Sequence, residues 1–307
     1  MSKFLWFVKI IIPVIGISSC AHTLETGHSK ELGELIGTTI VHLGTPDGRD
    51  IDVKLFYKEA ECRGCPLIVF SHGANATYDR YDVIIHHWVR EGFVVAAPLH
   101  VDSEEYHERE RYTPDRHLPT RIEDFSLVAS SLHEKVASVL PKLRISEDYI
   151  AAGHSFGALI AQIAGGAVVS GNSIDAVKAP SAIIAISPPG AVEGIIAETA
   201  WSSVSKPMLV VTGTDDVVPF VAPTWQDHLT SYEMAPPGMS IALVFDGIDH
   251  YFNGAFGRVD DVDGNEHAVE YLNKATTAFM QQSQSGVSVS EIKLWQEYPD
   301  NVEVFQK

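Results

Sequence analysis

Short, unbroken apolar runs separated by helix-length segments most constrain the fold of this 307-residue chain. The runs are residues 67–70, 93–97, 149–152, 182–186, 208–211 and 241–245. Strands without polar alternation are buried on both faces, as in a parallel sheet covered by helices on each side. The pattern therefore predicts an α/β fold with a mostly parallel central sheet and helices on both faces.

The first part of the sheet has a different pattern. Two strand-like stretches, Thr38 to Leu43 and Ile51 to Tyr57, flank the turn-forming residues 44–50, which is typical of a hairpin. We therefore expect the sheet to begin with an antiparallel pair. Periodicity and turn residues predict helices at 78–92, 118–140 (with Pro119 in its first turn), 155–169, 223–232 and 266–282. We expect one catalytic domain over residues 36–283, with 284–307 as a tail that could pack on it.

The charge balance excludes one class of partner. The chain has 22 Lys and Arg residues against 40 Asp and Glu residues, which gives a net charge of −18. Nucleic-acid affinity comes mainly from basic side chains that neutralise phosphates, so we expect no nucleic-acid partner.

The N-terminus indicates export. Lys3 precedes a mostly apolar run at residues 4–17, which is shorter than the roughly 20 residues that a membrane-spanning helix needs. The ending Ile17-Ser18-Ser19-Cys20 resembles the bacterial lipobox, which implies lipidation of Cys20 and a membrane anchor facing the periplasm. Cleavage after Ala21 and soluble secretion are the alternative. The boundaries are 1–20 for the signal and 21–35 for a polar linker.

Cys62 and Cys65 form a Cys-x-x-Cys pair. In an exported protein such a pair in a loop is more typical of a local disulfide than of a redox centre. A redox pair would lie at a helix start, where the helix dipole favours a thiolate, but here Pro66 and a strand-like run follow.

Residues 153–157 read Gly153-His154-Ser155-Phe156-Gly157, between a strand-like run and a helix-like stretch. This is the context of a nucleophile elbow, in which glycines on both sides let the helix pack back against the strand. The pattern predicts Ser155 as a nucleophile held at a helix N-terminus.

A serine hydroxyl needs a base and an acid that orients the base, in the chain order Ser, Asp, His. His250 follows the last core strand and is the expected base. Asp215 and Asp216 both follow residues 208–211. Counting from Gly213 selects Asp216, but counting back from Pro219 selects Asp215, which is preferred because the proline anchors the loop.

An oxyanion hole needs two aimed donors. One is expected from the Phe156 N–H, directly after the nucleophile. The other is expected from the Ala74 N–H, which Gly73 would turn toward the site, with His72 bracing the loop.

These motifs carry a family resemblance. Residues 66–73, 92–98 and 153–157, together with Arg121 and Asp124, resemble bacterial α/β-hydrolases of the platelet-activating-factor acetylhydrolase and dienelactone-hydrolase-like group, related to chlorophyllases and cutinases. The resemblance covers residues 36–282. It implies a catalytic triad of Ser155, His250 and an aspartate at 215 or 216, with Ala74 and Phe156 as oxyanion donors. Dienelactone hydrolases proper use a cysteine where this chain has Ser155.

We therefore expect a serine carboxylic-ester hydrolase that works through an acyl-enzyme. We expect it to be monomeric, to need no metal or cofactor, and to act on short-acyl, small-molecule or lipid-like esters. Loops 99–117 and 188–206, the latter including Trp201, would shape its pocket. One alternative is a catalytically inactive, lipid-anchored binding protein. A metal site is disfavoured because its candidates lack a compact helical spacing. Those candidates are His100, Asp102, Glu104, His107 and His117.

Overall fold

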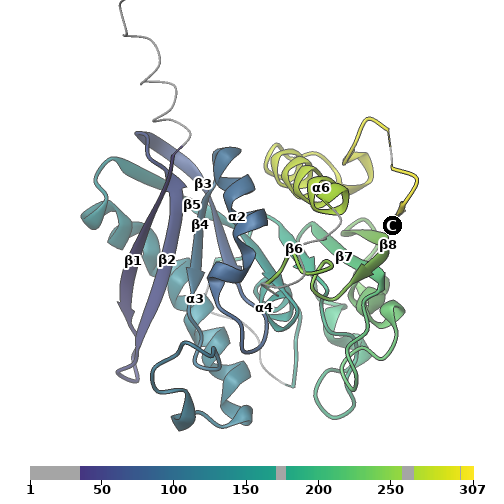
Figure 1. Cartoon of the computed structure of the whole chain (residues 1–307), viewed down its shortest axis with the longest axis horizontal. Helices are drawn as coiled ribbons and strands as arrows, with labels where there is room; N and C mark the ends of the chain where they lie inside the picture. The colour runs from purple at the N-terminus through teal and green to yellow at the C-terminus, as the bar shows by residue number, and fades with distance from the viewer. Residues whose placement is uncertain (1–34, 171–177, 258–265, 298) are drawn as a thin grey trace, which may run out of the picture.

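A nine-stranded sheet forms the centre of the molecule, in the order β1-β2-β4-β3-β5-β6-β7-β8-β9 (Figure 1). The computed structural model describes residues 35–170, 178–257, 266–297 and 299–307. The predicted export signal, Cys20 and the linker up to residue 34 lie outside the described residues.

The strand pairing matches the expected fold class. The hairpin of β1 and β2 is antiparallel, and β2 also pairs antiparallel with β4. From β4 through β3, β5, β6 and β7 to β8, all neighbours are parallel. The strands are β1 (Ile36–Gly44), β2 (Asp50–Lys58), β3 (Cys62–Ser71), β4 (Val94–Pro98), β5 (Leu143–His154), β6 (Ile183–Ile186), β7 (Met208–Asp215), β8 (Ser240–Asp249) and β9 (Val302–Gln306).

Helices cover both faces of this sheet, as the apolar runs predict. The α-helices are α2 (Asp82–Arg90), α3 (Pro114–Val139), α4 (Phe156–Ala164), α5 (Thr230–Met234) and α6 (Glu266–Gln284). Helices α2 and α6 pack in one core cluster, and α3 and α4 pack in the other. Alternate residues of β3 divide between them, since Ile68 faces the first cluster and Val69 the second. The α/β prediction is confirmed.

The predicted helices differ from the structure at their ends, and the one expected at 78–92 is the 3₁₀ turn η1 (Tyr78–Tyr81) followed by α2. Helix α3 begins at Pro114, four residues before the expected start at 118, because Pro114 occupies its first turn and Pro119 is accepted inside it. Helix α4 ends at Ala164, where Gly165 and the positive φ of Gly166 turn the chain. Half of the helix expected at 223–232 is the 3₁₀ turn η4 (Trp225–Leu229), which begins with a capping box of Thr224 and Asp227 and is followed by α5.

The tail adds a strand to the sheet. Residues Val302–Gln306 pair antiparallel with β8, from Ile241 opposite Gln306 to Phe245 opposite Val302. The remaining 3₁₀ turns are η2 (Arg109–Arg111), η3 (Glu198–Trp201) and η5 (Val289–Glu291).

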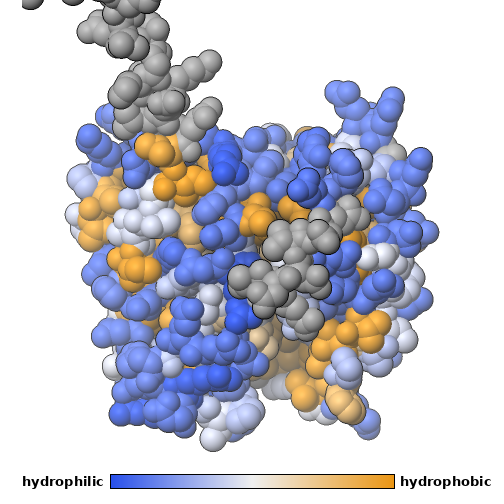
Figure 2. Space-filling model, viewed as in Figure 1, coloured by the Kyte–Doolittle hydropathy of each residue, from blue (hydrophilic) through white to orange (hydrophobic). Residues whose placement is uncertain are grey.

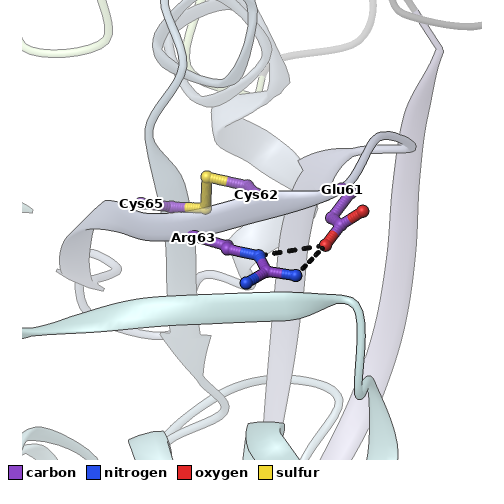
Figure 3. The surroundings of a disulfide bond; sticks show 4 residues. All are labelled: Glu61, Cys62, Arg63 and Cys65. Atoms are coloured by element: carbon purple, nitrogen blue, oxygen red, sulfur yellow. Dashed lines mark hydrogen bonds and ion pairs between the residues drawn. A yellow bond between two sulfur atoms is a disulfide. The ribbon is translucent and has the colours of Figure 1, made fainter.

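Cys62 and Cys65 form a disulfide with a Cα–Cα distance of 5.9 Å (Figure 3). The pair lies inside β3 and not in a loop, so that part of the prediction is wrong. The register of β3 against β5 shifts twice here, between Arg63 and Cys65 and between Cys65 and Leu67. These irregularities fall where the disulfide joins residues three apart, a spacing that a regular strand does not bring together.

None of the helices in the described ranges has the length and apolar run that a membrane crossing requires.

Candidate active site

Ser155 lies at the turn between β5 and α4, in the strand-to-helix setting that the motif predicts. Its backbone has φ 54° and ψ −121°, a conformation that costs energy for a residue with a side chain. The flanking glycines have no space for a side chain: a Cβ on Gly153 would lie 2.3 Å from the Gly157 oxygen, and a Cβ on Gly157 would lie 1.9 Å from the Ser71 oxygen. Close packing of α4 against β5 and β3 therefore holds the serine in its strained turn.

His250 connects the serine to an acid. It follows β8, and its Nε2 lies 3.0 Å from Ser155 Oγ. Its Nδ1 lies 2.7 Å from Asp216 Oδ1. With Nδ1–H donating to the carboxylate, Nε2 is free to accept the serine proton, which is the arrangement that a general base requires.

The acid that reaches His250 is Asp216, so the preference for Asp215 is wrong on geometry. Asp215 is the last residue of β7 and is exposed, whereas Asp216 is buried and accepts a hydrogen bond of 2.9 Å from Thr212. After Gly213 the pairing with β8 is irregular, since Gly213 lies opposite Phe245 and Asp215 lies opposite Asp249. Counting from the glycine therefore works here, and counting back from Pro219 does not.

A second histidine contacts the same carboxylate. His228 in η4 is buried, and its Nε2 lies 2.8 Å from Asp216 Oδ1. Its Nδ1–H donates to the Pro188 carbonyl at 2.6 Å. Burial opposes ionisation of Asp216, but the contacts with His228 and His250 outweigh it and hold the pKa of Asp216 well below its usual range. The acid is thus a carboxylate throughout the physiological pH range.

Asp216, His228 and His250 are the one group of potential metal ligands within the described ranges. Their nitrogen-to-oxygen distances are 2.7 and 2.8 Å. A tetrahedral Zn²⁺ with bonds of about 2.0–2.2 Å keeps its ligand atoms roughly 3.4 Å apart. These side chains are therefore direct partners of one another, and an ion would have to separate them. The five loop residues weighed as a metal site do not form such a group among the described residues.

The loop after β3 approaches the nucleophile as expected. A Cβ on Gly73 would lie 3.6 Å from Ser155 Cβ, and within the described residues no acceptor is hydrogen-bonded to the Ala74 N–H. Phe156 is the first residue of α4, so its N–H has no partner within the helix. The loop after β3 therefore lies beside Ser155, and neither expected oxyanion N–H has a hydrogen-bond partner among the described residues.

Arg121 of α3 holds the loop after β3 (residues 72–77), which is called the oxyanion loop below. It donates to the carbonyls of His72 (2.6 Å) and Gly73 (3.0 Å) and pairs with Asp102 at 2.7 Å. Its guanidinium carbon also lies 4.5 Å from the centre of the Phe156 ring. His72 Nδ1–H donates to the Gly73 carbonyl at 2.8 Å, so His72 braces the loop.

A second Ser–His–Asp relay lies behind this loop. Ser71 Oγ is 2.9 Å from His100 Nε2, and His100 Nδ1 is 2.9 Å from Asp124 Oδ2. All three side chains are fully buried, and Arg49 donates to Asp124 at 2.7 Å. Burial raises the pKa of Asp124 to about 7, against the opposing pull of Arg49. This relay belongs to the protein interior.

Trp201 does not line a pocket, so that expectation is wrong. It lies in η3, is fully buried, and donates from its indole N–H to Gln162 Oε1 at 2.8 Å. It joins the core cluster beside α4 because the loop 188–206 folds back over that helix.

The sequence gives no signal for His228, which falls within the helix expected at 223–232 and lies in no motif. The chain order Ser–Asp–His describes a single acid and a single base, so only the fold shows that η4 brings a second imidazole to Asp216.

Comparisons with known proteins agree with this fold. Residues 84–225 match the family model of class 3 lipases. A ferulic acid esterase from Streptomyces cinnamoneus is 15% identical with a TM-score of 0.63, over 88% of this chain and 96% of that one. A puromycin hydrolase is 17% identical with a TM-score of 0.60, over 85% of this chain. This chain spans only 41% of the length of that hydrolase.

A third solved structure, a puromycin-hydrolyzing peptidase of Mycobacterium tuberculosis, is 18% identical with a TM-score of 0.57, over 82% of this chain and 40% of that one. No curated protein matches the sequence. At these identities the solved structures speak for the fold alone.

Proposed function

We propose that this chain, an α/β-hydrolase fold whose central segment matches class 3 lipases, is a serine carboxylic-ester hydrolase. One observation carries the proposal: the His250 ring lies between Ser155 Oγ at 3.0 Å and Asp216 Oδ1 at 2.7 Å. The strained backbone of Ser155 at a helix N-terminus supports it further.

The proposed reaction uses these groups in turn. Ser155 Oγ attacks the ester carbonyl while its proton passes to His250 Nε2, and the Ala74 and Phe156 N–H groups stabilise the oxyanion. His250 then gives that proton to the leaving alcohol, and an acyl-enzyme remains. Water, deprotonated by His250, releases the acid and restores Ser155.

The surface beside the acid favours apolar esters. Directly after Asp216, residues Val217–Pro223 carry no charge, and Phe220 is 95% exposed with a φ of 68°. Val217 and Val221 are exposed as well. The face drawn in Figure 2 carries several hydrophobic groups set in a mostly hydrophilic surface. We infer that this apolar loop (residues 217–223) contacts the acyl or alcohol part of a lipid-like ester. A series of p-nitrophenyl esters of increasing acyl length, including the short acyl groups expected from the sequence, tests this.

Replacement of the nucleophile tests the function itself. Ser155→Ala should abolish turnover of p-nitrophenyl acetate and labelling by a fluorophosphonate probe, while circular dichroism shows a folded protein. Ser138→Ala, an exposed serine near the end of α3, is the matched control and should keep both. If the wild-type chain neither turns over esters nor reacts with the probe, the alternative of an inactive binding protein is favoured.

Export and lipidation are also proposals. Incorporation of labelled fatty acid into the wild-type chain but not into Cys20→Ala would support a lipid anchor; equal behaviour of the two chains would favour soluble secretion.

A further inference from the structure

A chain of buried hydrogen bonds joins the oxyanion loop to the loop that carries the base. The Gly73 N–H donates to Tyr81 Oη at 2.9 Å. Tyr81 Oη lies 3.0 Å from His154 Nδ1, and His154 Nε2 lies 2.8 Å from the His250 carbonyl. The Tyr81 and His154 side chains, from η1 and from the elbow, therefore link residues 73 and 250.

The position of every proton in this series of hydrogen bonds follows from the groups at its two ends. An amide N–H can only donate, so Tyr81 Oη accepts from Gly73 and gives its own proton to His154 Nδ1. His154 Nε2–H then donates to the His250 carbonyl, which can only accept. This assignment requires a neutral imidazole, and burial lowers the pKa of His154 to about 3. Burial also raises the pKa of Tyr81, so its hydroxyl keeps its proton.

Close packing makes these links rigid. The Tyr81 and His154 rings are 5.5 Å apart, and Phe256 packs on both at 5.4 and 5.3 Å. A Cβ on Gly73 would lie 2.9 Å from Tyr81 Oη and 3.1 Å from His154 Nδ1. The backbone of the oxyanion loop thus packs directly against these two side chains.

Each end of this series of hydrogen bonds fixes a group that the proposed reaction uses. The Gly73 carbonyl is held by Arg121 and His72, and its N–H is held by Tyr81. Because a trans peptide points its N–H opposite to its carbonyl, the bonds to the Gly73 carbonyl fix the direction of the Ala74 N–H, and the bond to Tyr81 fixes the peptide that precedes it. At the other end, the bond from His154 fixes the backbone of His250, whose ring faces Ser155.

We propose that Tyr81 and His154 are positioning residues that set the distance between the oxyanion donors and the base. The proposal rests on the proposed function. A spacer of this kind acts on the transition state, in which both the donors and the base are engaged, and has little effect on binding of the ester itself.

Tyr81→Phe is the test, because it removes one hydroxyl and keeps the ring. We expect kcat for p-nitrophenyl acetate to fall about 10- to 100-fold, part of the roughly 10²- to 10³-fold loss that follows removal of an oxyanion donor, with KM within about twofold. The inhibition constant of a boronic acid, which mimics the tetrahedral adduct, should rise by the same factor. Tyr149→Phe is the matched control, since Tyr149 is a buried tyrosine in β5 whose hydroxyl has no hydrogen-bond partner within the described residues.

A kcat for Tyr81→Phe within twofold of wild type, or a loss of kcat with an unchanged boronic-acid constant, would overturn the inference. His154→Asn makes the same measurement from the other side if Tyr81→Phe does not fold. Because the two side chains act as one spacer, the double variant should lose little more than the worse single variant; additive losses would contradict the proposal. The wild-type enzyme separates the two hypotheses, since an inactive wild type refutes the function and an unaffected Tyr81→Phe refutes only the spacer.

Discussion

Two Ser–His–Asp relays lie in this molecule, and their hydrogen bonds are nearly identical. Ser155, His250 and Asp216 are joined by contacts of 3.0 and 2.7 Å, and Ser71, His100 and Asp124 by two contacts of 2.9 Å. They differ in everything around the serine. Ser155 is partly exposed at a strained turn before a helix, whereas Ser71 ends a strand, is fully buried and accepts a further bond from Arg121.

The difference teaches that relay geometry alone does not make an active site. A nucleophile also needs access for the substrate, donors aimed at the developing oxyanion, and a serine held away from other partners. Ser155 is partly exposed and precedes the first N–H of α4, whereas Ser71 is fully buried and already accepts a bond from Arg121. We therefore expect the first to control the rate and the second to control stability.

Removing the acid of each relay gives the sharpest contrast. Asp216→Asn should lower kcat about 10⁴-fold, because the asparagine no longer holds the tautomer of His250 in which Nε2 accepts a proton. Asp124→Asn should keep kcat within about tenfold but lower the free energy of unfolding by about 3 kcal/mol, since it leaves Arg49 buried without its full partner. Steady-state kinetics and urea unfolding measure the two effects. Asp215→Asn is the matched control, and a kcat loss there as large as in Asp216→Asn would mean that the acid is misassigned.

The oxyanion loop gives the next largest effect. Gly73→Ala should lower kcat about 10²-fold, because the added methyl group would displace the loop from Tyr81 and His154 and with it the Ala74 N–H. Gly44→Ala, where a Cβ would meet its nearest atom at 3.7 Å, should leave kcat unchanged. Equal activity of the two variants would show that the donors lie elsewhere.

We expect a substrate only at the Ser155 relay, and the apolar loop should affect which esters this relay hydrolyses. Phe220→Ser should lower kcat/KM about tenfold for long-acyl esters, the loss expected from about 1–2 kcal/mol of apolar contact, and leave p-nitrophenyl acetate unaffected. Val139→Ser, an exposed apolar residue at the end of α3, should change neither. A uniform loss across acyl lengths would argue against contact between this loop and the acyl chain.

The smallest effect concerns pH and stability. Burial lowers the pKa of His72, His100 and His154 in the folded protein. A histidine with a lowered folded pKa stabilises the fold fully above its unfolded value of about 6.5, and this stability is lost as the pH falls below it. The free energy of unfolding should therefore decrease by about 1.4 kcal/mol per pH unit for each such histidine. For His154 the loss should continue down to about pH 3.

Urea unfolding between about pH 7 and pH 5 checks this slope. His154→Asn should reduce the slope by about 1.4 kcal/mol per pH unit, which is the contribution of one histidine. His267→Gln, which changes an exposed residue of α6, should not alter the slope. An unchanged slope in His154→Asn would show that this histidine is not held neutral.

Local patterns predicted the parts of this molecule that depend on neighbours in the chain. The apolar runs located the parallel strands, and the glycines around Ser155 located the elbow, because both patterns express packing within a short segment. The choice between Asp215 and Asp216 failed because the counts from Gly213 and from Pro219 disagree. Only the contact between His250 and Asp216 in the fold shows which count applies.

Contacts between distant segments could not be predicted for the same reason. Tyr81 and His154 are 73 residues apart, and His228 reaches Asp216 from a turn that was expected to be a regular helix. Trp201 falls in the loop 188–206, which the sequence predicts to shape the pocket. Its partner Gln162, on α4, is what makes it part of the core.

The order in which the strands occur along the chain has a consequence for biosynthesis. Strand β8, which leads into His250, receives its outer neighbour only when residues 302–306 have been made. Until then β8 is an edge strand, and its unpaired backbone N–H and C=O groups can form hydrogen bonds with other chains. Nascent chains that stop before residue 302 should therefore need a chaperone to stay soluble, and the base should reach its final position late in folding.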